Sequence, residues 1–343
     1  MDTRRTPVIR HRVLCASSAP SALRCFILPV LRGPMSELIR LTLFENYRFV
    51  LYAPFYAAHA IGAYADEGLA VELLPSPGTG RAEAALAAGE VDAVWMGPIR
   101  VMKHHDDNPG SPLVAFAEVV CRDPFSLVGA KPNPGFDLPE LSRLRFASVS
   151  EVPTPWLCLE QDLRDNGIDP ASLPRITGRT MPENTAALAD GSLDVAQLFE
   201  PFVEQAVSAG GHVWFPASGR GRTSYTVFVT RRERLVADPE PFRRMVRAIY
   251  RTQRWVDAEP PESLAAAIAD YFPALERRVL TRALARYKKQ GVWGRDPVLP
   301  EAGFDRLRRA LLGSGFLSRE VPFGDCVDNR LAEAAVAQNQ VPG

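Results

Sequence analysis

The chain has 343 residues, roughly twice the length of a typical single domain, so two domains or one enlarged domain are expected. Its 40 Lys and Arg residues balance its 40 Asp and Glu residues, and this zero net charge leaves no electrostatic signature of nucleic-acid binding. No stretch approaches about 18 uninterrupted apolar residues, so the sequence predicts no membrane-spanning helix.

Segment 1–34 is set apart by its charge, because it holds six arginines and one aspartate. A secretory signal combines a basic start, an apolar run and a small-residue cleavage site. Here the apolar run Cys25–Leu31 contains Pro29 and is flanked by arginines, so it makes a poor signal. We interpret the segment as a disordered arm, a start assigned upstream of Met35 or a degenerate export signal. We therefore expect a cytoplasmic protein, with a periplasmic location as the alternative.

From residue 39 onward, short apolar strands alternate with short helices. The strands expected first are Ile39–Phe44, Val71–Leu74, Val91–Trp95 and Leu113–Val120. The helices expected between them are Pro54–Ala63, Gly80–Ala88 and Pro98–His105. This alternation predicts an α/β fold with mostly parallel sheets and helices on both faces.

A second set of alternating elements follows. Its strands are Leu144–Val149, Leu193–Leu198, His212–Phe215 and Tyr225–Thr230, and its helices are Pro155–Asp165, Pro182–Ala189 and Pro201–Ala209. From Pro239 to about Leu317 the pattern is helical. We expect two α/β units and a helical C-terminal tail.

Two nine-residue segments, Ala84–Asp92 and Ala186–Asp194, are identical at six positions. Each reads as a helix end, a Gly C-cap, an Asp and then a buried strand that ends before a proline. Chance is one explanation, because such joints favour small residues. The other explanation is two similar lobes whose equivalent strands point their carboxyl ends, where ligands bind in open α/β sheets, at one cleft.

Three segments carry a family resemblance: Ile39–Pro54, Gly62–Leu74 and Ala88–Gly97. The second reads G-x-Y-x-x-E-G-L-x-V-E, and the third completes the motif L-x-x-G-x-V-D. These motifs resemble the SsuA/THI5-like (NMT1) group, over roughly residues 38–320. The resemblance implies a type 2 periplasmic-binding-protein fold, shared by receptors of ABC importers and by pyrimidine synthases of thiamine biosynthesis.

The resemblance also implies how the chain divides. Lobe 1 would comprise residues 35–126 and 223–320, lobe 2 residues 127–222, and a C-terminal tail residues 321–343. The chain would cross between the lobes near Ser126–Lys131 and near Thr223–Thr230.

The synthases of this group carry pyridoxal phosphate on a lysine, followed four residues later by a histidine. These positions align with Met96 and Arg100 of this chain. Methionine cannot form a Schiff base, and the clustered cysteines of the synthases are missing from the sequence. We therefore disfavour a synthase and expect no cofactor.

Metal chemistry is not expected either. The five cysteines are irregularly spaced and include no CxxC pair, so the sequence encodes neither a zinc site nor a disulfide framework. His104–Asp107 is a metal-like cluster, but neighbouring helix residues point in different directions and leave too few ligands on one face. Phosphate-binding loops and serine-hydrolase motifs are also missing.

The candidate ligand contacts of the first lobe all lie where a strand meets a helix. They are Phe44, Glu45, Asn46, Tyr47, Thr79, Gly80, Met96 and Gly97. Phe44 and Tyr47 offer faces on which a planar ligand stacks. The backbone N–H groups of Thr79 and Gly80 are suited to an anionic group. Ordinary strand–helix loops explain the same residues equally well.

The candidates in the second lobe and the return crossing are Ser148, Ser150, Thr154, Trp156, Glu200 and Tyr225. Thr154 suits an N-cap, which leaves free N–H groups and hydroxyls near the cleft. Trp156 is either a stacking wall or a core anchor. Glu200 ends an apolar strand, where an unpaired carboxylate is costly. It either accepts a hydrogen bond from an amino or amidine group of the ligand or forms a salt bridge with Arg220 or Arg222.

Two classes of function fit these observations. The first is a solute-binding protein, similar to an ABC-importer receptor, whose lobes close on a small polar, heteroaromatic or amine-bearing molecule. Its expected partners are that ligand and an ABC permease. The second is a cytoplasmic enzyme on the same scaffold, acting in thiamine-pyrimidine metabolism or in decarboxylation of an aromatic acid. Fold alone does not separate the two.

Overall fold

The computed structural model describes residues 38–45, 47–75, 78 and 80–340. The expectations for segment 1–34, Asn46 and Thr79 therefore lie outside the described residues. No helix in the described ranges is both long and apolar enough to cross a membrane.

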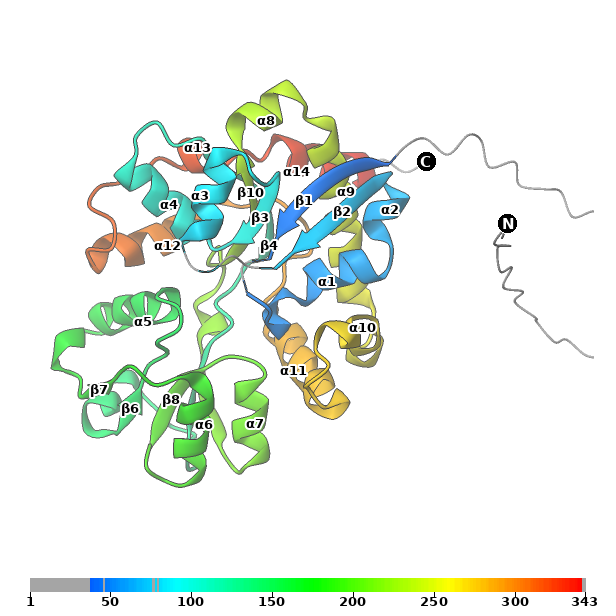
Figure 1. Ribbon diagram of the computed structural model, residues 1–343. Coiled ribbons are helices and arrows are strands. Elements are labelled where there is room, and N and C mark those ends of the chain that lie inside the picture. Colours follow the sequence, from blue (N-terminus) through cyan, green and yellow to red (C-terminus); the bar gives the residue numbers. More distant parts are fainter. Residues whose placement is uncertain (1–37, 46, 76–77, 79, 341–343) are drawn as a thin grey trace, which may run out of the picture. The chain divides into compact units, whose positions relative to one another are not determined.

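The first lobe is built on a five-stranded sheet with the order β2-β1-β3-β10-β4 (Figure 1). Its strands are β1 (Ile39–Phe44), β2 (Leu69–Leu74), β3 (Ala93–Met96), β4 (Leu113–Val120) and β10 (Thr226–Arg231). Strand β10 runs antiparallel between β3 and β4, and the other four strands share one direction. Strands β3 and β4 are buried along their whole length, as their continuous apolar sequences predict.

The second lobe is built on another five-stranded sheet, with the order β7-β6-β8-β5-β9. Its strands are β5 (Ser126–Gly129), β6 (Phe146–Ala147), β7 (Arg175–Ile176), β8 (Val195–Leu198) and β9 (His212–Pro216). Strand β5 is antiparallel to both of its neighbours, β8 and β9, whereas β6 is parallel to β7 and β8. The expected two-lobed fold with mostly parallel mixed sheets is confirmed.

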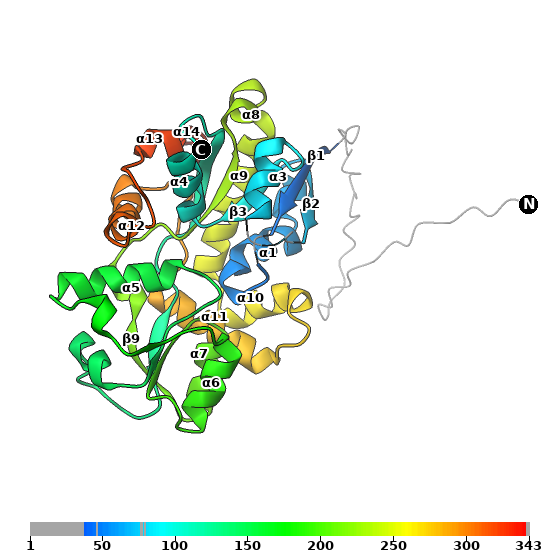
Figure 2. The same cartoon turned by 60° about the vertical axis from the view of Figure 1, so that its left-hand side comes forward.

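Helices cover both sheets (Figure 2). In the first lobe these are η1 (Val50–Tyr52), α1 (Ala53–Ala60), α2 (Ala63–Asp66), α3 (Arg81–Ala88) and α4 (Pro98–Asp107). In the second they are η2 (Leu138–Arg143), α5 (Thr154–Asp165), η3 (Pro170–Ser172), α6 (Met181–Ala189), α7 (Phe202–Ser208) and η4 (Ala217–Arg220).

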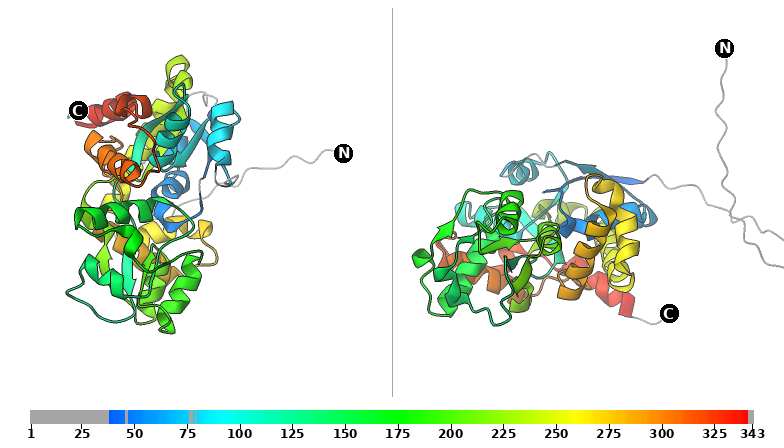
Figure 3. Two further views of the ribbon diagram at one scale, coloured as in Figure 1. Left: turned by 90° about the vertical axis from the view of Figure 1, so that its left-hand side faces the viewer. Right: turned by 90° about the horizontal axis from the view of Figure 1, so that it is seen from below.

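The helices after β10 pack mainly on the first lobe and also reach the second. They are α8 (Arg232–Ala237), α9 (Glu240–Ala258), α10 (Pro261–Ile268), η5 (Ala269–Tyr271), α11 (Arg277–Gln290), α12 (Glu301–Gly313), α13 (Phe323–Cys326) and α14 (Arg330–Gln340). Helix α9 packs on α1 and α2, whereas α11 contacts α7 and α12 contacts α5 of the second lobe (Figure 3).

The internal sequence similarity corresponds to equivalent joints in the two lobes. Helices α3 and α6 are each followed by a glycine with positive φ, Gly89 at 81° and Gly191 at 77°. Each joint then supplies an aspartate to the neighbouring strand: Asp92 accepts from the backbone N–H of Thr42 at 2.9 Å, and Asp194 accepts from that of Arg145 at 2.8 Å. The two lobes are therefore built on the same local pattern.

The two expected crossings between the lobes need correction. Ser126–Gly129 is strand β5, and most of the segment expected for the return crossing, Thr223–Thr230, belongs to strand β10. The chain therefore passes between the sheets at residues 121–125 and returns at 217–225. The four residues of strand β5 are too few to show a periodic pattern in the sequence. The expected C-terminal tail contains α13 and α14, and α14 packs on α9 with Ala332 and Ala335 buried. The other lobe boundaries stay a prediction.

Candidate functional site

A cavity of about 50 Å³ lies where loops of the two lobes meet. Tyr47 follows β1, and Gly97 follows β3, both in the first lobe. Phe199 follows β8 in the second lobe, and Phe125 and Tyr225 lie on the two crossing segments. The cavity is therefore at the carboxyl ends of equivalent strands, where the sequence predicted a cleft.

Aromatic side chains are prominent in the cavity wall. Six aromatic side chains line it: Tyr47, Phe49, Tyr52, Phe125, Phe199 and Tyr225. The rings of Phe125 and Phe199 are stacked, with centroids 4.8 Å apart and planes within 2°. Phe49 meets Phe199 edge-on at 4.7 Å. Flat apolar faces of this kind suit a planar ligand.

Two helices begin at this cavity, one in each lobe. Gly97 is the N-cap of α4, and α5 begins at Thr154 after Pro153. The first N–H groups of a helix have no partner within it and carry the positive end of the helix dipole. Arg100, one turn into α4, adds a positive charge and lies with its Nε 3.4 Å from Oε1 of Glu83. The polar groups of the cavity thus favour a ligand with hydrogen-bond acceptors.

Tyr225 carries an unused hydrogen-bonding group. Its hydroxyl is buried, and it has no partner among the described residues. Burial raises the pKa of this phenol well above its ordinary value, so the hydroxyl keeps its proton. A buried polar group without a partner costs about 1–3 kcal/mol. A ligand or a water molecule that accepts a hydrogen bond from Tyr225 would remove this cost.

Glu151 is the acidic residue among those that line the cavity. Its carboxylate accepts hydrogen bonds from the backbone N–H groups of Met181 at 2.7 Å and Ser150 at 3.2 Å. It therefore holds the start of α6 in place.

Four of the residues predicted from the sequence line the cavity: Tyr47, Gly97, Thr154 and Tyr225. The other described candidates do not. Phe44 and Met96 pack in the apolar core of the first lobe, and Gly80 is the N-cap of α3. Ser150 accepts a hydrogen bond from the N–H of Gly178 at 2.9 Å, and the buried hydroxyl of Ser148 has no partner among the described residues.

Glu45 and Trp156 have structural partners. The carboxylate of Glu45 pairs with Arg48 at 2.5 Å and accepts a hydrogen bond from the hydroxyl of Tyr56 at 2.7 Å. Trp156 packs in the core of the second lobe, with the guanidinium of Arg175 3.9 Å from its ring centre. This packing matches the alternative of a core anchor rather than that of a stacking wall.

The expectation that Glu200 faces the cleft needs correction. Its carboxylate forms an ion pair with Arg286 of α11 and accepts a hydrogen bond from the N–H of Glu204 at 3.0 Å. Burial raises the pKa of this carboxyl, and Arg286 opposes that rise. The salt-bridge interpretation is thus the one the geometry supports, but with Arg286 rather than Arg220 or Arg222 as the partner.

Sequence reasoning missed most of the aromatic wall. Phe49, Tyr52, Phe125 and Phe199 line the cavity and were not singled out. Phe199 directly precedes the candidate Glu200, and Phe125 directly precedes the expected crossing at Ser126. An aromatic residue at the end of a strand is usually interpreted as part of the hydrophobic core, so neither was selected. Arg100 was noticed only through an alignment with the synthases.

All four members of the metal-like cluster have structural partners, and Asp107 accepts a hydrogen bond from Lys103 at 2.6 Å. His104 bonds to the hydroxyl of Ser111 at 2.8 Å, and His105 bonds to the carbonyl oxygen of Leu113 at 2.9 Å. Asp106 accepts hydrogen bonds from the N–H and the hydroxyl of Ser318. The contacts of His104, His105 and Asp106 fasten α4 to its surroundings.

A two-lobed α/β fold with a cavity at the carboxyl ends of its parallel strands defines the class of periplasmic-binding-protein-like folds. Residues 51–263 match the family described as NMT1/THI5 like. The chain belongs to this family, as its motifs predicted.

Individual relatives agree with this assignment. A protein of Bacillus subtilis (strain 168) named as a binding protein, YtlA, is 26% identical over 292 residues, which cover 84% of this chain and 87% of that protein. The periplasmic sulfonate-binding protein SsuA from Methylobacillus flagellatus KT has a similar structure, with a TM-score of 0.71, 14% identity and coverage of 90% and 96%. The desulfurization enzyme DSZB is also similar, with a TM-score of 0.63, 13% identity and coverage of 88% and 100%. At these identities the solved structures show the fold alone.

Proposed function

We propose that the protein is the solute-binding component of an ABC import system, which captures a small planar molecule between its lobes and delivers it to a permease. The observation that carries this proposal is the aromatic cavity, lined from both lobes and from both crossing segments. A ligand that contacts both lobes favours the closed arrangement over the open one. The likeness to YtlA, named as a binding protein, supports the same function.

The polar groups of the cavity narrow the chemistry of the ligand. Aromatic walls favour a heteroaromatic or aromatic ring over an aliphatic chain. The hydroxyl of Tyr225, the first backbone N–H groups of α4 and α5 and the guanidinium of Arg100 are all hydrogen-bond donors available to a ligand. An amine-bearing ligand has less support, because the carboxylate of Glu200 is already paired. We therefore favour a ring with carbonyl, carboxylate or similar acceptor groups.

The size of the cavity implies movement. A volume of about 50 Å³ holds a few water molecules at most and is too small for a six-membered ring. Entry of the ligand therefore requires the lobes, or the side chains that line the cavity, to move apart.

The location that we propose is periplasmic. The expected cytoplasmic location has no support among the relatives, whereas the SsuA protein from Methylobacillus is described as periplasmic.

The enzyme alternative has weaker support. Burial raises the pKa of Cys121 to about 11 and that of Cys158 to about 12, so these thiols are poor nucleophiles near neutral pH. The similarity to DSZB shows that a protein with this fold is described as an enzyme, but at 13% identity it transfers no activity.

The experiment that tests the proposal is a thermal-shift screen with four groups of compounds: pyrimidines, aromatic carboxylates, alkanesulfonates and polyamines. A ligand at 100 times its dissociation constant stabilises the native state by about 2.7 kcal/mol. We expect such shifts from planar compounds with acceptor groups and none from polyamines. Each hit is then incubated with the protein and recovered by chromatography. A compound that is recovered unchanged supports the binding function, whereas a compound that is converted to a product would support the enzyme alternative.

A further inference from the structure

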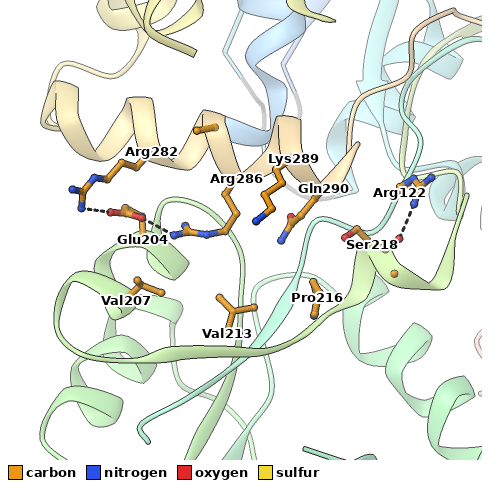
Figure 4. Close-up of a pocket in the computed structure, with 12 residues that line it drawn as sticks. Arg122, Glu204, Val207, Val213, Pro216, Ser218, Arg282, Arg286, Lys289 and Gln290 are labelled. Atoms are coloured by element: carbon orange, nitrogen blue, oxygen red, sulfur yellow. Dashed lines mark hydrogen bonds and ion pairs between the residues drawn. The ribbon is translucent and has the colours of Figure 1, made fainter. Parts of the chain in front are cut away.

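A groove of about 770 Å³ lies between α11 and the second lobe (Figure 4). It shares no lining residue with the aromatic cavity. Its upper wall is α11, and its lower wall comes from α7, β9 and η4. Neither the family resemblance nor the proposed function assigns it a role.

The upper wall of the groove is cationic. Arg282, Arg286 and Lys289 are four and three residues apart on α11, a spacing that places all three on one helix face. Arg122, on the first crossing segment, adds a fourth positive charge at one end. Figure 4 shows Lys289 extending from α11 into the groove toward the lower wall.

Only part of this positive charge is neutralised. Glu204 accepts hydrogen bonds from Arg282 at 3.2 Å and from Arg286 at 2.7 Å, and Glu200 takes the other side of Arg286. Arg122 donates to the carbonyl oxygen of Ser218 at 3.1 Å. Within the described part of the chain, neither Arg122 nor Lys289 has a carboxylate partner. Four cations and two carboxylates leave a net charge of +2.

The lower wall of the groove combines Glu204 with a set of apolar side chains. Val207, Val213 and Pro216 line it, and Ala285 adds a small side chain from α11. The volume is within the range of roughly 300–1,000 Å³ that small-molecule sites occupy. An apolar wall beside unpaired cations matches an organic anion that has an apolar body and one acidic group.

We infer that this groove is a second binding site, separate from the aromatic cavity, for an organic anion with an apolar ring or chain and a carboxylate, sulfonate or phosphate group. The acidic group lies between Lys289 and Arg122, and the apolar body rests on Val213 and Pro216. Because the walls come from both lobes, an occupied groove links α11 to the second lobe.

The test uses 8-anilino-1-naphthalenesulfonate as the probe and its uncharged analogue N-phenyl-1-naphthylamine as the comparison, both followed by fluorescence. Lys289 is exposed and has no carboxylate partner in the described part of the chain. Lys289→Glu is therefore expected to fold normally and to weaken binding of the anionic probe about tenfold or more. The matched control is Arg277→Glu, which makes the same change of charge at an exposed position of α11. Its neighbours three and four residues further on, Leu280 and Thr281, do not line the groove, so this variant is expected to alter binding by less than twofold. Binding of the anionic probe is also expected to weaken as salt is raised.

Two outcomes would overturn the inference. One is equal binding of the anionic probe by the wild type and Lys289→Glu. The other is loss of probe binding in Arg100→Gln, since this change lies in the aromatic cavity and would place the probe there. The compounds identified by thermal shift separate the two sites, because their stabilising effect should be the same in Lys289→Glu as in the wild type. The inference about the groove can therefore be disproved while the proposed function still holds.

Discussion

The aromatic cavity and the groove beside α11 lie on opposite sides of one short segment, Phe199-Glu200. Phe199 lines the cavity, whereas the carboxylate of Glu200 pairs with Arg286, which lines the groove. The cavity is small and aromatic, with an unpaired hydroxyl donor, whereas the groove is larger and held by ion pairs. The comparison teaches that volume alone does not identify a ligand site. Both sites are lined by residues of both lobes, so the cavity is distinguished by its aromatic rings and by the unsatisfied hydroxyl of Tyr225.

The largest effect is expected from Glu200→Ala. Removing one partner of a buried ion pair usually costs 3–5 kcal/mol, and Arg286 keeps Glu204, so we expect a loss of about 3 kcal/mol in the free energy of unfolding. Urea unfolding without ligand measures it. Glu72→Ala, at an exposed position of β2, is the control and should change stability by less than about 0.5 kcal/mol. A variant of Glu200 with unchanged stability and a lost ligand response would return this residue to the ligand site.

An intermediate effect is expected from Glu204→Gln, and it depends on pH. Burial alone would raise the pKa of Glu204, but hydrogen bonds from Arg286 and Arg282 outweigh it and lower this pKa. The stabilising contribution is therefore present above the ordinary carboxyl pKa and is lost as pH falls through the lowered value. We expect the variant to be about 1–2 kcal/mol less stable at pH 7, with a gap that narrows below about pH 4.5.

Glu204→Gln also sharpens the distinction between the two regions. It frees Arg282 and Arg286 from their shared carboxylate, so the anionic naphthalene probe should bind more tightly to the groove. Ligands of the aromatic cavity should bind as before. A stability gap that stays constant between pH 7 and pH 3 would show that the charge of Glu204 does not stabilise the fold.

The smallest loss of stability is expected from Tyr225→Phe. The phenol hydroxyl is buried without a partner in the described structure, so its removal should not lower the free energy of unfolding and should raise it by up to about 1–3 kcal/mol, the cost of the unsatisfied group. Affinity for the compound selected by thermal shift should fall about two- to tenfold, the value of one neutral hydrogen bond. Calorimetric titration measures it. Equal affinity in both proteins would exclude Tyr225 as a donor to the ligand.

The sequence predicted the bounds of a strand correctly where its residue pattern is long and clearly delimited. Strands β1 and β4 have the predicted bounds. Strand β7 was missed because two residues carry no pattern and because β7 is held by pairing with β6.

The candidate site was only partly predictable for a different reason. Tyr47, Gly97, Thr154 and Tyr225 were found because each follows a strand or begins a helix. Phe125 has the sequence signature of a core residue, and only the path of the chain between the sheets brings it to the cavity. Glu200 was placed at the correct strand end, but the direction of its side chain depends on α11, which is more than 70 residues further along the chain.

The position of β10 has a consequence for how the protein is made. All strands of the second sheet come from the continuous segment 126–216, whereas the first sheet needs β10 between β3 and β4. During synthesis the second lobe can complete its hydrogen bonding while the facing edges of β3 and β4 still have no partner strand. Unpaired strand edges promote association between chains. The first lobe therefore keeps unpaired strand edges, and with them a tendency to aggregate, for longer than the second lobe, although most of its strands are synthesised first.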